Sequence, residues 1–178
     1  MKTNELVAIF FKDFEECEEV SIQTYDGQSQ LVDKVVGKRV LIERDCKFDS
    51  DYERQDSPVI KIKIEDKEME HVGSSMLVAD TGLINILDDY VKKVDVQNFN
   101  HSVPIVNSMI NDSKNSFTSK RKAILIRNRN GTPIAIYAGN KVSVHKINVP
   151  QSTGIVIDGK NLFVYRCDYT IYDLDLIK

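Results

Sequence analysis

The stretch from Arg121 to Ala138 constrains the fold more than any other part of the sequence. Two runs of strand-forming residues, Ala123–Ile126 and Ile134–Tyr137, flank the dipeptide Asn130-Gly131. Asn and Gly tolerate the positive φ angles that a two-residue type I′ turn requires. The sequence therefore predicts an antiparallel hairpin with Asn130-Gly131 at its tip.

The residues after this hairpin predict further short strands. Turn signals occur at Gly139-Asn140 and Asp158-Gly159, and strands are expected at Val142–Val149 and Tyr169–Ile177. Six closely spaced strands over 120–178 predict a basic, all-β antiparallel domain, either a small barrel or a sandwich. An Asn- and Ser-rich stretch, 98–119, predicts a linker or long loop with a short ordered patch at Ile105–Ile110.

Residues 1–97 have a different pattern, which predicts an acidic α+β domain. Apolar residues at helical spacing predict amphipathic helices at Thr3–Cys17 and Thr81–Lys93, the second burying Leu83, Leu87 and Tyr90. Strands are expected at Val20–Thr24, Lys38–Arg44, Val59–Ile64 and Met69–Val72, whereas Ser29–Val36 fits a helix or a strand, with helix favoured. The predicted fold class is α+β, with two amphipathic helices on a small antiparallel sheet in this half.

Several motifs resemble catalytic or metal sites, and each has a simpler interpretation. The acidic loop Asp45–Asp56 begins like a calcium loop but lacks its glycine and its final glutamate. Glu65-Asp66-Lys67 imitates part of a nuclease motif but falls at a predicted turn, and Gly73-Ser74-Ser75 fits a helix N-terminus or an ordinary cap. The three histidines and three cysteines show no ligand spacing, so neither a metal nor a cofactor is expected.

Charge is distributed unevenly along the chain. Residues 1–97 carry a net charge of −9, and residues 98–178 carry +6. The candidate contact residues are five cations in the second region: Lys120, Arg121, Lys122, Arg127 and Arg129. With Tyr137, Phe163, Tyr165 and Tyr169 on nearby strands, they suit single-stranded nucleic acid; the alternative, which we favour, is that they face the acidic region across a domain or subunit contact.

These observations favour binding over catalysis. A chain of 178 residues without an apolar run near 20 residues predicts a cytoplasmic protein without a membrane span, in the host cytoplasm if a phage encodes it. Abundant Ile, Lys and Asn suggest a bacterial or phage genome. We expect a non-enzymatic accessory protein that contacts another protein or its own copies as a homo-oligomer. The alternatives are single-stranded nucleic-acid binding and, third, a small metal-dependent hydrolase or nuclease.

Overall fold

The computed structural model describes residues 19–51, 53–93 and 105–177. Within these ranges, twelve strands form three antiparallel sheets. The central sheet has six strands in the order β2-β1-β6-β11-β10-β9. In that order the strands span Leu31–Gly37, Val20–Tyr25, Met76–Asp80, Lys160–Tyr165, Ser152–Ile157 and Val142–Lys146. The strands therefore come from both sides of the predicted linker, and β6 pairs directly with β11.

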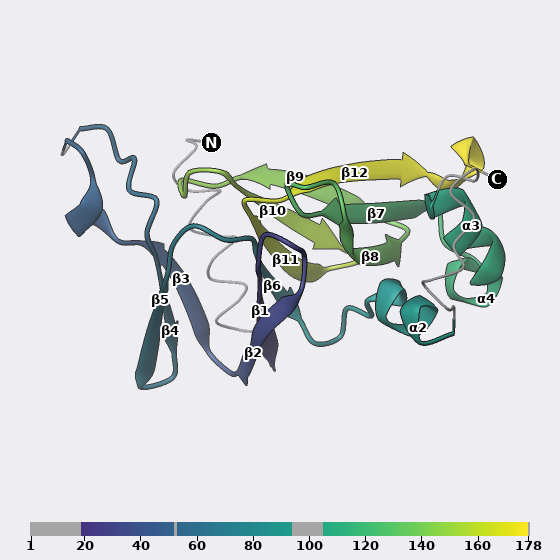
Figure 1. The fold of residues 1–178 in the computed structure, drawn as a ribbon, viewed down its shortest axis with the longest axis horizontal. Helices are drawn as coiled ribbons and strands as arrows, with labels where there is room; N and C mark the ends of the chain where they lie inside the picture. Colours follow the sequence, from purple (N-terminus) through teal and green to yellow (C-terminus); the bar gives the residue numbers. More distant parts are fainter. Residues whose placement is uncertain (1–18, 52, 94–104, 178) are drawn as a thin grey trace.

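Two smaller sheets cover the faces of the central sheet. The N-terminal outer sheet has the order β3-β4-β5, with bounds Val40–Arg44, Ile60–Ile64 and Lys67–His71. The C-terminal outer sheet has the order β12-β7-β8, with bounds Asp168–Asp173, Lys122–Arg127 and Pro133–Gly139. Figure 1 shows the N-terminal outer sheet at one end of the molecule and the C-terminal outer sheet toward the other.

Apolar side chains of the central sheet alternate between its two faces, and each face packs against one of the outer sheets. Ile22, Val78 and Phe163 form one cross-strand row, which packs against Ile42 and Ile62 of the N-terminal outer sheet. On the opposite face, Leu77 and Val164 pack with Ile124 and Tyr137 of the C-terminal outer sheet. Each fully buried Ile or Phe stabilises the fold by about 1.5–3 kcal/mol, so these two clusters hold the three layers together.

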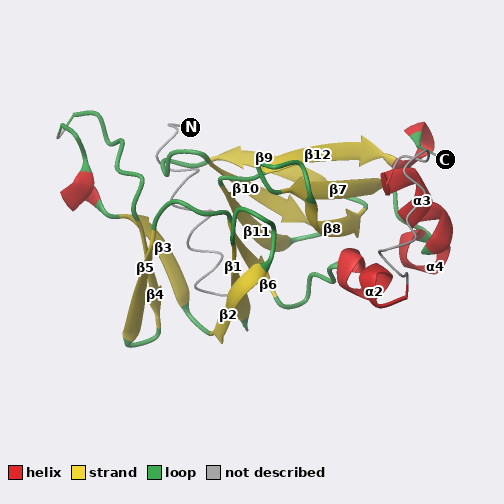
Figure 2. Ribbon diagram, viewed as in Figure 1, coloured by secondary structure: helices red, strands yellow, loops and turns green. Residues whose placement is uncertain are grey.

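The helices form a fourth layer on the outer face of the C-terminal outer sheet. They are α2 (Ile86–Lys93), α3 (Ile105–Asp112) and α4 (Lys114–Phe117), and Figure 2 shows them together at one end of the molecule. Ile86, Tyr90 and Met109 pack there against Leu125 and Ile136. Among the described residues, no helix is long and apolar enough to cross a membrane.

The α+β prediction is wrong, because the described chain is mainly β and α2 packs on the C-terminal outer sheet instead of an N-terminal one. Tyr90 is buried as predicted, while Leu83 and Leu87 are half-buried. The six predicted C-terminal strands exist, but they divide between two sheets and do not close into a barrel. The predicted helix Thr3–Cys17 lies outside the described residues. The division at 98–119 stays a prediction, although α3 covers the whole of the predicted ordered patch.

Two N-terminal strands differ from the prediction. Residues Leu31–Gly37 form β2 and not a helix: Ser29 adopts a φ of +67° instead of capping a helix, and β-branched Val32, Val35 and Val36 favour a strand. Strand β6 follows Gly73-Ser74-Ser75 in place of a helix. Because β6 is buried on both faces, its sequence MLVA lacks the alternation that reveals half-exposed strands.

The hairpin Arg121–Ala138 forms, but its turn is longer than predicted. The Gly131 amide donates to the Asn128 carbonyl at 2.8 Å, and the Asn128 amide donates to the Thr132 carbonyl at 2.9 Å. Among residues 129–131, only Gly131 has a positive φ, +88°. This geometry is a three-residue loop with Gly in the left-handed position. The predicted two-residue type I′ geometry occurs instead at Asp158-Gly159, where φ is +50° and +81°.

Candidate functional site

The five predicted contact residues lie at the two ends of β7 and do not form one patch. Lys120, Arg121 and Lys122 precede or begin the strand, whereas Arg127 ends it and Arg129 lies in the next loop. Six residues of extended chain separate the ends by about 17–20 Å. The sequence cluster is therefore split in space.

The described side-chain contacts of these cations are local to residues 120–178. Lys120 Nζ lies 3.8 Å from Asp158, and Lys122 Nζ lies 3.1 Å from Asp173. Arg127 donates to Thr170 at 3.0 Å, and Arg129 donates to the Gln151 side-chain oxygen. Arg121 contributes main-chain bonds to Gly139 and Leu174. The described ion pairs of these residues therefore do not join the acidic region to the basic one.

The aromatic residues that accompanied the cations in the nucleic-acid hypothesis have little free surface. Tyr137, Phe163 and Tyr165 are buried in the two sheet interfaces, and Tyr169 is half-buried. Burial raises the pKa of the Tyr137 hydroxyl far above its usual value. Base stacking needs an exposed ring face, so these rings give the nucleic-acid hypothesis no support.

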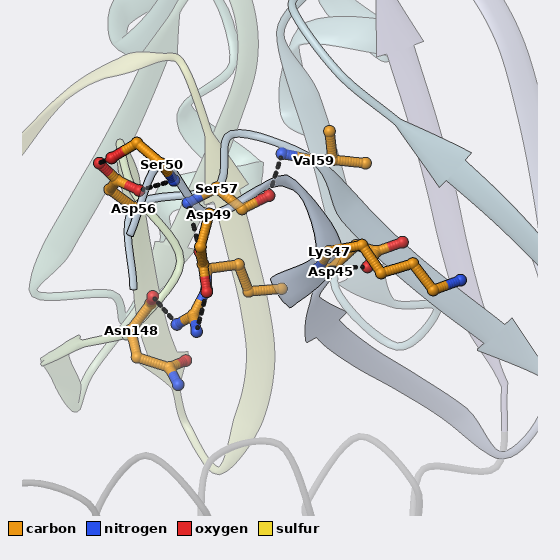
Figure 3. Close-up of polar contacts among 9 residues, drawn as sticks. Asp45, Lys47, Asp49, Ser50, Asp56, Ser57, Val59 and Asn148 are labelled. Carbon is orange, nitrogen blue, oxygen red and sulfur yellow. Dashed lines mark hydrogen bonds and ion pairs between the residues drawn. The ribbon is translucent and has the colours of Figure 1, made fainter. Parts of the chain in front are cut away.

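The acidic loop between β3 and β4 uses its carboxylates to order itself, as Figure 3 shows. Asp49 forms a two-point ion pair with Arg44, at 3.1 and 3.2 Å, and also accepts the Ser57 amide at 2.8 Å. Asp56 accepts the Ser50 hydroxyl and amide, and these bonds lower its pKa. Asp45 accepts the Lys47 amide at 3.0 Å. Within the described residues, no group of three or more acidic, His or Cys side chains could hold a metal ion.

The remaining motifs also have structural roles. Glu65 and Asp66 form the two-residue turn between β4 and β5, with Ile64 opposite Lys67. His71 lies 2.7 Å from the Ser74 carbonyl and packs edge-on against Tyr165, while His145 contacts the Ser143 hydroxyl. His101 and Cys17 lie outside the described residues. Burial raises the pKa of the Cys167 thiol to about 11, and Cys46 is exposed.

The edge strand β2 is the most unusual surface of the described chain, and the sequence analysis missed it. It is an edge of the central sheet, and residues Leu31–Val36 are all exposed. Four of the six are apolar: Leu31, Val32, Val35 and Val36 are 51%, 64%, 36% and 48% exposed. In the sequence these four residues form two adjacent pairs, 31–32 and 35–36, separated by two charged residues. Such a pattern places apolar, mainly β-branched side chains on both faces of one strand, which is typical of an unprotected edge.

A groove of about 520 Å³ adjoins the end of this strand. Val35, Val36 and Gly37 line one side, and Ile64 and Met69 of the β4–β5 hairpin line the other. A Cβ atom on Gly37 would lie 2.3 Å from Ile64 Cγ2, so only glycine permits this close approach. Three acidic residues (Glu19, Glu65, Glu68) and two lysines (Lys38, Lys67) complete the lining.

The described residues thus define a mainly β protein of three stacked antiparallel sheets with an exposed apolar edge. The chain belongs to the family described as Domain of unknown function (DUF5052). The family model matches residues 10–177, a range that includes all three sheets. No curated protein matches the sequence, and no solved structure matches it.

Proposed function

We propose that this protein is a non-enzymatic binding protein of the bacterial or phage cytoplasm, which joins another protein through strand β2. The observation that carries the proposal is the exposed apolar edge of the central sheet. An edge strand presents unpaired N–H and C=O groups, and proteins usually protect such an edge with charge, proline or a covering element. Among the described residues, β2 has one acidic and one basic side chain and no proline.

Strand addition is the binding mode that suits this edge. An incoming strand would continue the ladder through its main chain, while its alternating side chains contact Val36 on one face and Val35 on the other. On the Val35 face, the groove beside Gly37 supplies further apolar contact from Ile64 and Met69. Main-chain bonds would give affinity, and this groove would give selectivity.

The charges of β2 favour a strand from a different protein over a second copy. A two-fold axis between two edge strands makes them antiparallel and keeps each sheet face on its own side. Asp33 and Lys34 point to opposite faces of β2, so the two Asp33 side chains would share one face and the two Lys34 side chains the other. Like charges across a strand pair destabilise it. A foreign strand with an acidic residue near Lys34 avoids this repulsion.

To test the proposal, the full-length protein is immobilised and an extract of the organism that encodes it is passed over it. The proteins retained by the wild type and by each variant are then compared. The double variant Val32→Lys/Val36→Lys removes the apolar edge, and Val144→Lys, a 47% exposed position on the opposite edge strand β9, is the matched control. We expect one partner to be retained by the wild type and the control and lost with the double variant. Equal retention on all three surfaces would contradict the proposal.

Two further measurements separate the alternatives. Light scattering on the intact protein reports self-association, and a dimer that the double variant abolishes would replace the foreign strand with a second copy. The nucleic-acid alternative predicts binding to single-stranded DNA that weakens steeply with salt, with a slope of log K against log salt concentration of roughly 0.7 per phosphate contact. Substitution of Lys120 and Arg129 should reduce that binding.

A further inference from the structure

A cleft of about 420 Å³, to which β2 contributes no lining residue, lies where five segments meet. These are the β6–α2 loop, α2, β8, the β10–β11 turn and the stretch from α4 to β7. Its floor is apolar and includes Leu83, Ile86, Tyr137 and Ile157. The volume falls within the range of small-molecule sites, which combine an apolar lining with a few polar groups.

Two lysines at the rim of this cleft have incompletely satisfied ammonium groups. Lys120 Nζ lies 3.8 Å from Asp158 Oδ2, and Lys160 Nζ lies 3.9 Å from Asp80 Oδ1. Both distances exceed the range of a hydrogen bond. An ammonium group has three donors, so each lysine retains donors for a ligand.

The two aspartates cannot approach their lysines more closely without losing main-chain bonds. Asp158 accepts the amides of Lys141, at 2.8 Å, and Asn140, at 2.9 Å. These amides lower the pKa of Asp158. Asp80 accepts the Gly82 amide at 2.8 Å. The backbone amides therefore satisfy part of each carboxylate, and the two ammonium groups lie beyond hydrogen-bond distance from them with donors left for an incoming anion.

Two glycines shape the cleft around these charges. A Cβ atom on Gly82 would lie 2.2 Å from Lys160 Nζ, and one on Gly139 would lie 2.5 Å from Ile157 Cγ2 and 3.3 Å from Asp158 Oδ2. A side chain at either position would displace a residue that lines the cleft. The backbone therefore leaves room for Lys160 at the rim and for Ile157 in the floor.

We propose that this cleft binds a small amphipathic carboxylate, with its apolar chain on the floor and its carboxylate between Lys120 and Lys160. An apolar floor beside two ammonium groups matches an acyl chain that ends in an acid. Asp89 also lines the cleft and is exposed, so its carboxylate opposes the binding of an anion. The site takes its floor from both sides of residues 94–104, and it is independent of the β2 edge.

Titration calorimetry on the full-length protein tests this proposal with decanoate and with decylamine, which has the same chain length and the opposite charge. We expect saturable binding of decanoate and none of decylamine. Lys120→Gln/Lys160→Gln should weaken decanoate binding by roughly tenfold or more, because charge-assisted hydrogen bonds are lost. Lys146→Gln on β9 removes a positive charge from an exposed position away from the cleft and should leave decanoate binding unchanged, while Asp89→Asn should tighten it.

The variants must keep the wild-type melting temperature, since a misfolded cleft would also lose the ligand. Gly82→Ala is a second probe, because it displaces Lys160 without removing a charge and should weaken decanoate binding. The proposal is overturned if folded wild-type protein gives no saturable binding of decanoate, or if decylamine binds as tightly. It is also overturned if Lys146→Gln weakens decanoate binding as much as the rim variant does.

Discussion

Asn128 joins three loops at the end of the C-terminal outer sheet and is 5% exposed. Its Oδ1 lies 2.7 Å from the Ser75 hydroxyl, and its Nδ2 donates to the Asp26 carbonyl at 2.8 Å and to the Ser29 hydroxyl at 3.0 Å. The β1–β2 turn, the start of β6 and the β7–β8 loop therefore share one buried amide. A buried polar group is stabilising only while its partners are present.

Asn128→Ala should lower the free energy of unfolding by about 2 kcal/mol or more, because it removes the hydrogen bonds that this buried amide makes to Ser75, Asp26 and Ser29. Asn130→Ala is the control, since that exposed side chain also bonds to the β1–β2 turn, through Gly27, but in contact with water. Urea denaturation measures both. A loss for Asn128→Ala no larger than that of the control would show that the junction is not stabilising.

Gly131 and Gly27 offer an opposed pair of turn substitutions. A Cβ would meet no atom within 4 Å at either position, but only Gly131 has a positive φ. Gly131→Ala should therefore destabilise the protein by about 1 kcal/mol, whereas Gly27→Ala should be neutral or stabilise it by up to about 1 kcal/mol. Thermal melting of both variants gives the comparison. An equal change in melting temperature for both variants would contradict a left-handed conformation at Gly131.

Cys167 and Cys46 should differ in reactivity toward iodoacetamide. The buried Cys167 thiol has a pKa of about 11, so at pH 8 about one molecule in a thousand carries the reactive thiolate. Cys46 is exposed and should label first. Peptide mass spectrometry after brief labelling distinguishes the two sites, and rapid labelling of Cys167 in folded protein would contradict its burial.

At the scale of elements, strands marked by alternation or by a turn signal could be predicted, including the buried hairpin β7–β8, whereas β6 and β2 could not. Strand β4 alternates Ile60, Ile62 and Ile64 with lysines, so its position follows from the sequence. Strands β6 and β2 lack that contrast, because β6 is buried on both faces and β2 is exposed on both. The candidate binding edge was missed for the same reason. The basic residues were expected to form one patch, but the extended strand β7 places them at its two ends.

Helix α2 allows a paired test of the fourth layer. Ile86 is 5% exposed against the C-terminal outer sheet, and Val91 on the same helix is 50% exposed. Ile86→Ala should lower the free energy of unfolding by about 2–4 kcal/mol, because it leaves a cavity, and Val91→Ala by less than about 0.5 kcal/mol. Equal effects in urea denaturation would mean that α2 does not pack as described.

At the scale of the whole molecule, the described sheets and helices bury the faces of the central sheet, and none of the described residues covers its β2 edge. The opposite edge strand, β9, is shorter and has two apolar residues, Val142 and Val144, beside the polar Ser143, His145 and Lys146. The asymmetry of the two edges gives the protein one apolar surface suited to strand addition. Our central claim is that a partner protein covers β2 in the cell.

A photoactivated crosslinker placed at position 32 or at position 144 tests this claim most directly, because it reports contacts within living cells. We predict one discrete adduct with a different protein from position 32, and none from position 144. Replacing Val36 with Lys should abolish the adduct. The absence of any adduct from position 32, or the same adducts from both edges, would contradict the claim.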